Sequence, residues 1–179
     1  MTVQVQHVRR RLAHVSARAA IAQLGRNEFE GYASLFGVPD GAGDVVAPGA
    51  FAASLRKRGP ARVRMLYQHF AHEPIGVWEQ IKEDSRGLYV RGRLVDVPRA
   101  HEVAELLREN ALNGLSIGFR TLRARRDAVK HTRTLLEVEL WEVSVVTFPL
   151  LAGSQVTAIG GKGETLAEDI RRASLAMSS

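Results

Sequence analysis

The chain has 179 residues, of which 45% are hydrophobic and 25% are charged, values typical of one globular domain. It contains no cysteine, which excludes a Cys nucleophile, a thiolate zinc site and a disulfide framework. Any covalent chemistry must therefore come from Ser, Thr, Lys or a carboxylate. We expect no metal and no cofactor.

The charge balance is basic, with 25 Lys and Arg against 19 acids and a net charge of +6. Aromatic residues make up only 6% of the chain, and the arginines fall in short bursts without a nucleic-acid-binding signature, which argues against direct nucleic-acid binding. No apolar run approaches the roughly 20 residues that span a bilayer, so we expect no membrane segment.

Local patterns divide the chain into a basic N-terminal arm (1–27), a central domain (28–159) and a flexible C-terminal appendage (160–179) with one amphipathic stretch, Thr165–Met177. Alternation and helical spacing predict the central elements in chain order. They are a strand over Phe29–Gly37, a short helix over Pro48–Leu55 stopped by Gly59-Pro60, strands over Val63–His69, Ile75–Lys82 and Gly87–Val95, a helix from Pro98 to a left-handed stop at Asn113-Gly114, a strand from Leu115, and a last strand over Thr134–Thr147. The expected fold is therefore mainly β with some helix.

One segment, Gly114-Leu115-Ser116-Ile117-Gly118, fits the G-x-S-x-G pattern, in which glycines let a serine sit exposed on a sharp turn. The pattern alone is weak, because a strand that needs small residues for close packing gives the same spacing. An α/β-hydrolase is excluded because the chain is short and mostly strand. The only histidine after Ser116 in the sequence is His131, and it lies among basic residues typical of an exposed hairpin tip.

A base and an orienting acid can be sought by strand parity, because a triad is recognised by geometry and not by chain order. His69 shares the predicted face of Val63, Met65 and Tyr67, and His72 is an alternative base outside that alternation. In the last strand Glu142 shares parity with the apolar Leu136, Val138 and Leu140, so a carboxylate there needs a partner. Glu139, on the other face, is the runner-up. Ser116, His69 and Glu142 together would allow acyl transfer.

Several blocks, in one order, resemble the prohead maturation proteases of tailed bacteriophages. The blocks are Phe29–Gly37, Gly43–Phe51, Gln68-His69, Pro74-Ile75-Gly76, Gly114–Phe119 and Trp141–Pro149. That family is similar in fold to the herpesvirus assembly proteases, a small closed β-barrel with surrounding helices. The resemblance therefore implies a barrel of this type over residues 28 to 159.

The resemblance also implies an activity and a set of site residues. It implies a serine endopeptidase inside the immature capsid, in the cytoplasm of the bacterial host, which removes the scaffolding segment of the major capsid protein and cleaves itself. The family's histidine falls on His69, its serine on Ser116 and its acid on Glu142, where the herpesvirus relatives have a second histidine. The herpesvirus enzymes work as dimers, so the resemblance leaves self-association as a dimer possible here, although the sequence identifies no dimer interface.

The chain departs from the family pattern after the last strand, where Pro149-Leu150-Leu151-Ala152-Gly153 replaces a Pro-Ala-Asn-Pro-like segment. Either terminal segment could be a self-cleavage segment or a tether to the shell. Three other functions stay open at this point: a catalytically silent capsid-assembly scaffold, another serine hydrolase such as an esterase, and nucleic-acid binding within the capsid. A phage, a prophage or a gene transfer agent could encode such a chain.

Overall fold

A computed structural model describes residues 24–129 and 131–160 of the chain. The predicted N-terminal arm, apart from its last four residues, and the predicted C-terminal appendage, apart from Gly160, lie outside the described residues. The amphipathic stretch Thr165–Met177 lies outside them as well.

The described residues form eight strands, two α-helices and one short 3₁₀ helix. In chain order these are β1 (Glu28–Leu35), β2 (Asp44–Val46), α2 (Ala52–Arg58), η1 (Pro60–Arg62), β3 (Arg64–Tyr67), β4 (Pro74–Glu83), β5 (Gly87–Leu94), α3 (Pro98–Arg108), β6 (Gly114–Asp127), β7 (Thr132–Val146) and β8 (Val156–Ile159). The prediction of a mainly β fold with surrounding helices is confirmed.

All eight strands belong to one sheet in the order β2-β7-β3-β4-β5-β1-β8, with β6 paired to β7. The sheet curls round on itself, and short backbone contacts join its edges. Leu115 N–H donates to the Ser154 carbonyl over 2.9 Å, next to a bridge between Gly114 and Gln155 at the start of β8. On another side Phe36 forms a parallel bridge with Val46 of β2. These contacts bring the start of β6 close to β8 and β1.

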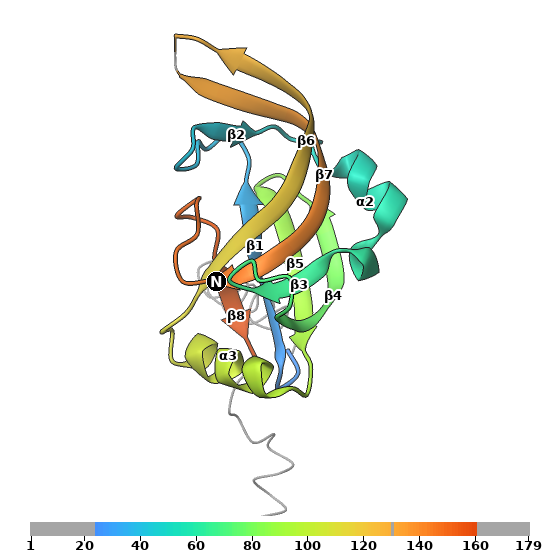
Figure 1. The fold of residues 1–179 in the computed structure, drawn as a ribbon, viewed down its shortest axis with the longest axis vertical. Helices are drawn as coiled ribbons and strands as arrows, with labels where there is room; N and C mark the ends of the chain where they lie inside the picture. Colours follow the sequence, from blue (N-terminus) through green and yellow to red (C-terminus); the bar gives the residue numbers. More distant parts are fainter. Residues whose placement is uncertain (1–23, 130, 161–179) are drawn as a thin grey trace, which may run out of the picture.

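The core lies inside the curled sheet and under α3, which covers one end of it (Figure 1). Helix α3 begins with Pro98 at its first turn and buries an apolar stripe at helical spacing, formed by Ala100, Val103, Ala104 and Leu107. Helix α2 ends at Arg58, and Gly59 follows with φ of 67°. The predicted stop at Gly59-Pro60 is therefore confirmed.

Some predicted boundaries are wrong. Helix α3 ends four residues early, because Asn110 and not Asn113 adopts the left-handed conformation, with φ of 54°. Helix α2 starts at Ala52, and Pro48 lies in the turn before it. Strands β2 and β8 were not predicted; they have three and four residues, too few to show alternation.

The parity predicted for the last strand is also wrong, because β7 is bulged. Gly118 pairs with Glu142 and the next residue of β6, Phe119, pairs with Leu140, so Trp141 is an extra residue on β7. The core face accordingly passes from Val138 and Leu140 to Val143 and Val145. Glu142 therefore lies on the face opposite to Leu140, and not with it.

Candidate active site

The site begins at the first residues of β6, which pair in regular antiparallel register with the end of β7. Ser116 pairs with Ser144, and Gly118 pairs with Glu142. Directly opposed residues of an antiparallel pair point to the same face, and so do residues two apart on one strand. Ser116, Ser144 and Glu142 therefore share one face, opposite to the face that places Val143 and Val145 in the core.

His69 comes to this face from a turn. The sequence analysis had predicted that it ends a strand, and that prediction is wrong. Strand β3 ends at Tyr67, and both Gln68 and His69 adopt left-handed backbone conformations, with φ of 51° and 62°. The turn is fastened to the end of β7. Gln68 N–H donates to the Val145 carbonyl over 3.0 Å. The Gln68 side chain donates to Thr147 Oγ1 over 2.6 Å and accepts from Thr147 N–H over 3.2 Å.

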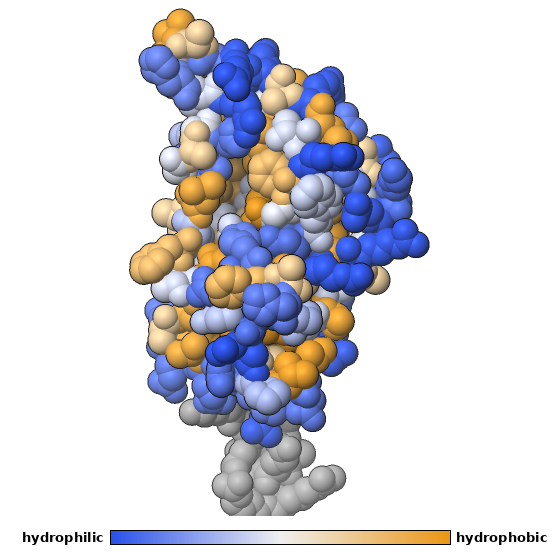
Figure 2. Space-filling view, in the orientation of Figure 1, coloured by the Kyte–Doolittle hydropathy of each residue, from blue (hydrophilic) through white to orange (hydrophobic). Residues whose placement is uncertain are grey.

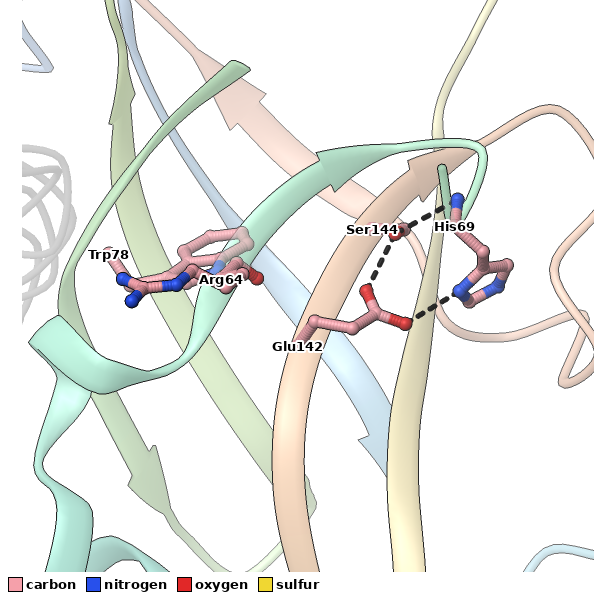
Figure 3. Close-up of polar contacts among 5 residues, drawn as sticks. All are labelled: Arg64, His69, Trp78, Glu142 and Ser144. Atoms are coloured by element: carbon pink, nitrogen blue, oxygen red, sulfur yellow. Dashed lines mark hydrogen bonds and ion pairs between the residues drawn. The ribbon is translucent and has the colours of Figure 1, made fainter. Parts of the chain in front are cut away.

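The imidazole of His69 meets the carboxylate of Glu142, with 2.7 Å between Nδ1 and Oε1 (Figure 3). The His69 side chain is 45% exposed, whereas that of Glu142 is only 13% exposed. The hydrogen bond to Glu142 raises the pKa of His69 above its ordinary value, against the opposing effect of burial. The carboxylate thus favours a proton on Nδ1 and stabilises the imidazolium.

The second oxygen of the carboxylate is also used. Ser144 Oγ lies 2.6 Å from Glu142 Oε2, and His69 N–H donates to the same Ser144 Oγ over 3.2 Å (Figure 3). Sequence analysis did not single out Ser144. The signal was present as Glu142-x-Ser144, since residues two apart in a strand share a face.

Gly118 leaves room for this carboxylate. A Cβ atom on Gly118 would lie 2.1 Å from Glu142 Oε1, the oxygen that contacts His69, and 2.7 Å from its carboxyl carbon. The Glu142 side chain thus lies directly over the backbone of β6. The second glycine of the G-x-S-x-G segment serves this close approach, on a continuous strand, and does not form the sharp turn that the pattern usually marks.

The runner-up residues lie elsewhere. Glu139 binds Arg58 over 2.5 Å and Arg120 over 2.9 Å, and these arginines hold the pKa of that carboxyl below its ordinary value. His72 stacks on the ring of Phe70, with centroids 5.6 Å apart. His131 is exposed at the tip of the β6–β7 hairpin, where the sequence placed it.

The arrangement leaves one imidazole nitrogen available. When Nδ1 carries a proton toward Glu142, Nε2 of a neutral His69 holds a lone pair and can accept a proton. Ser116 Oγ makes no hydrogen bond with the residues that the structure describes. Ser116 also lines a mainly apolar cleft, together with Val38, Val46, Ile117, Phe119, Leu150 and Leu151. A serine that shares the face of Glu142 and Ser144, the partners of His69, and that lines a cleft is suited to nucleophilic chemistry.

Within residues 24–129 and 131–160 no cluster of three or more His, Asp or Glu side chains could hold a metal ion. No helix in the same part of the chain is long and apolar enough to cross a membrane.

Comparison with known protein families decides the assignment of the chain. The profile of the caudovirus prohead serine protease family matches residues 14–169. The chain belongs to this family. Its prohead protease relative from Enterobacteria phage HK97 is 36% identical over 126 residues, which cover 68% of this chain and 55% of the relative. The chain therefore spans about half the length of that relative.

Solved structures resemble this prohead protease family member at low sequence identity. The capsid assembly protease of bacteriophage T4 matches with a TM-score of 0.55 and 14% identity, over 68% of this chain and 82% of the T4 chain. The protease of Kaposi's sarcoma-associated herpesvirus matches with a TM-score of 0.48 and 12% identity, over 85% and 76% of the two chains. The T4 likeness supports a shared fold.

Proposed function

We propose that this chain is a serine endopeptidase of phage capsid maturation, with Ser116 as nucleophile, His69 as general base and Glu142 as the group that orients His69. The observation that carries the proposal is the 2.7 Å contact between His69 Nδ1 and Glu142 Oε1 beside β6, where Ser116 shares their face of the sheet. Membership of the prohead serine protease family supports the reaction class.

The chemistry follows from these positions. Ser116 Oγ attacks the carbonyl carbon of the scissile peptide bond, and its proton passes to His69 Nε2. The cation so formed is stabilised by the Glu142 carboxylate, which also holds the ring in the Nδ1–H tautomer. His69 then gives the proton to the leaving amine as the C–N bond breaks. Water, deprotonated by His69, hydrolyses the acyl-serine ester and restores Ser116.

The proposed substrate is the scaffolding segment of the major capsid protein, together with the protease itself. The relative from phage HK97 is a prohead protease, and the structural neighbour from phage T4 is a capsid assembly protease. Both support action on capsid protein precursors. The place of action we propose is the interior of the immature capsid, in the cytoplasm of the bacterial host.

The test is co-expression of the chain with the major capsid protein encoded beside it, followed by intact mass and gel analysis. Wild type should shorten the capsid protein or itself, and Ser116→Ala should leave both at full length. Ser54→Ala, a buried serine on α2 that bonds the β7 backbone at Leu140, is the matched control and should still cleave. Equal cleavage by wild type and Ser116→Ala would exclude Ser116 as nucleophile. Intact proteins in assembled shells with both would favour the silent scaffold.

A further inference from the structure

The buried hydroxyl of Ser144 links His69, the proposed general base, to Glu142, the proposed orienting acid. We propose that Ser144 is a positioning residue, whose hydroxyl holds the Glu142 carboxylate and the His69 main chain in one fixed arrangement. This inference rests on the proposed function, because it assigns a role within the same site.

The hydrogen bonds around Ser144 form a closed ring. His69 N–H donates to Ser144 Oγ over 3.2 Å, Ser144 Oγ lies 2.6 Å from Glu142 Oε2, and Glu142 Oε1 lies 2.7 Å from His69 Nδ1. His69 therefore takes part in the ring twice, through its backbone N–H and through its imidazole Nδ1. A change in any one bond alters the position of the imidazole.

The proton positions in this ring are determined by the donors. A hydroxyl has one hydrogen, and a backbone N–H can only donate, so Ser144 accepts from His69 and gives its own proton to Glu142. An ionised carboxylate that accepts from Ser144 at Oε2 has Oε1 free to accept from Nδ1–H. The ring thus selects the tautomer whose Nε2 is unprotonated, the form that a general base needs.

Ser144 is well placed to hold its partners. It is 0% exposed and lies on β7 between Leu66 of β3 and Ser116 of β6, so neighbours on both sides fix its backbone. Its burial and its donated proton also make it a poor nucleophile, in contrast to Ser116. The left-handed backbone of His69 costs free energy, and the bond from His69 N–H to Ser144 helps to offset it.

The first readout is the ionisation of His69, which is measured as a function of pH by ¹H–¹⁵N NMR on protein labelled at histidine. The chain has six histidines, and His69→Gln assigns the signal by its loss. In wild type we expect the Nδ1–H tautomer and a raised pKa of His69. In Ser144→Ala the freed carboxylate should turn away, so the pKa of His69 should fall toward its ordinary value and the two tautomers should mix.

The sign of that change discriminates between roles. If Ser144 only tuned the charge of Glu142, removal of one donor would strengthen the remaining bond and the pKa of His69 would rise. If Ser144 only packed, Ser144→Ala would lower the melting temperature with the titration of His69 unchanged. Either result overturns the proposal. Ser54→Ala also removes a buried hydroxyl bonded near β7, at Leu140, and should leave the His69 titration as in wild type.

The second readout is cleavage. Ser144→Ala should lower kcat by roughly tenfold to a hundredfold, the usual effect of losing a hydrogen bond to a charged group, with KM nearly unchanged. Ser144→Thr keeps the hydroxyl and should restore the wild-type tautomer if it folds; if it does not fold, the contrast of Ser144→Ala with Ser54→Ala still decides.

The two readouts separate this proposal from the proposed function. A fall in the pKa of His69 in Ser144→Ala, in a chain without Ser116-dependent cleavage, would uphold the positioning role and refute the protease assignment. Cleavage that depends on Ser116 but is unaffected by Ser144→Ala would uphold the protease and refute the positioning role.

Discussion

The long β6–β7 hairpin has two halves built from the same two strands. The near half joins Gly114–Gly118 to Glu142–Val146 in consecutive, unshifted pairs. The far half, Phe119–Asp127 with Thr132–Leu140, extends away from the curled sheet (Figure 1) and is interrupted by three register shifts, the first of them at its boundary with the near half. Its surface is rich in arginine, and hydrophilic residues gather over this end of the molecule (Figure 2).

The difference lies in the neighbours of each half. In the near half β7 also pairs with β3, from Arg64 to Tyr67, and β6 bonds to Ser154. In the far half β7 pairs with only one further strand of the described chain, the three-residue β2, and otherwise bonds the turn and helix that follow β2, through Val138 N–H to the Ala50 carbonyl and Leu140 N–H to Ser54 Oγ.

Register is strongly specified where one face of a strand is buried, and weakly specified where both faces are polar, as in the exposed segment 123–126 of β6. Ser116, Glu142 and Ser144 of the candidate site lie on the near half, and the turn that carries His69 is bonded to it at Val145.

The largest effect should follow from neutralising the near-half carboxylate. Glu142→Gln keeps the shape but removes the charge and offers an amide to His69, so cleavage should fall by roughly 10⁴-fold, as for the equivalent change in other triads. Initial cleavage rates on the capsid protein measure this. Glu139→Gln, on the far half, is the control and should cleave at the wild-type rate.

Crowding the same carboxylate should have the next largest effect. In Gly118→Ala the new methyl group would lie 2.1 Å from Glu142 Oε1, so the carboxylate must move. A displacement of about 1 Å at a catalytic group can cost a hundredfold in rate. We expect a loss of that order, with the folded barrel retained by circular dichroism. Wild-type kinetics in this variant would contradict the close approach described here.

Glu139→Gln should have a modest effect on stability alone. Its carboxylate binds Arg58 and Arg120 at the start of the far half and is 17% exposed. Loss of this charge should lower the urea concentration at the midpoint of unfolding slightly, because ion pairs near the surface contribute little to stability. A large loss of activity at unchanged stability would mean that the orienting acid had been assigned to the wrong half.

The dependence of stability on pH should be a smaller effect than those above, and it should arise from His69, which pairs with Glu142 of the near half. The pKa of His69 is raised in the folded protein, so protonation favours folding. This contribution is fully present below about pH 6.5, the ordinary value for histidine, and is lost as the pH rises through the folded pKa. Since His69 is 45% exposed, it should amount to less than about 1 kcal/mol.

The measurement is the free energy of unfolding of wild type and His69→Gln between about pH 6 and pH 9. The difference between the two proteins should shrink as the pH rises. His131→Gln, at the exposed tip of the far half, serves as the control and should run parallel to wild type. A difference that grows with pH would contradict the His69–Glu142 pairing.

The smallest effect belongs to the exposed arginines of the far half. Arg125→Ala should change the free energy of unfolding by less than about 0.5 kcal/mol and leave cleavage unchanged, because the side chain is exposed. Thermal unfolding and cleavage of the capsid protein measure the two quantities. A marked loss of cleavage would show that the far half takes part in substrate binding.

The sequence allowed a good account of the elements and a partial one of the site. Long strands and helix α3 follow from alternation and helical spacing, whereas β2 and β8 are too short to carry a pattern. Glu142 was selected by parity with Leu140, yet the bulge at Trp141 places the two residues on opposite faces. Parity reasoning fails at any bulge, because the extra residue is not marked in the sequence.

His69 shows a second reason why local sequence patterns did not predict the site in full. Its alternation with Tyr67 predicted a strand face, but the chain leaves β3 at Tyr67 and turns with two left-handed residues. Bonds from Gln68 to Val145 and Thr147 hold this turn, and such long-range partners cannot be read from local sequence. The same holds for Ser144, whose partners become neighbours only when β3 and β7 pair.

Strand β7 pairs with β2, β3 and β6, and it is the last long strand of the described chain. Parallel pairing such as that of β3 with β7 joins segments far apart in the chain and is slow to form. During synthesis, His69 and Ser116 leave the ribosome before Glu142 and Ser144. The four residues of the candidate site therefore come together only after β7 has been made and has paired with both β3 and β6.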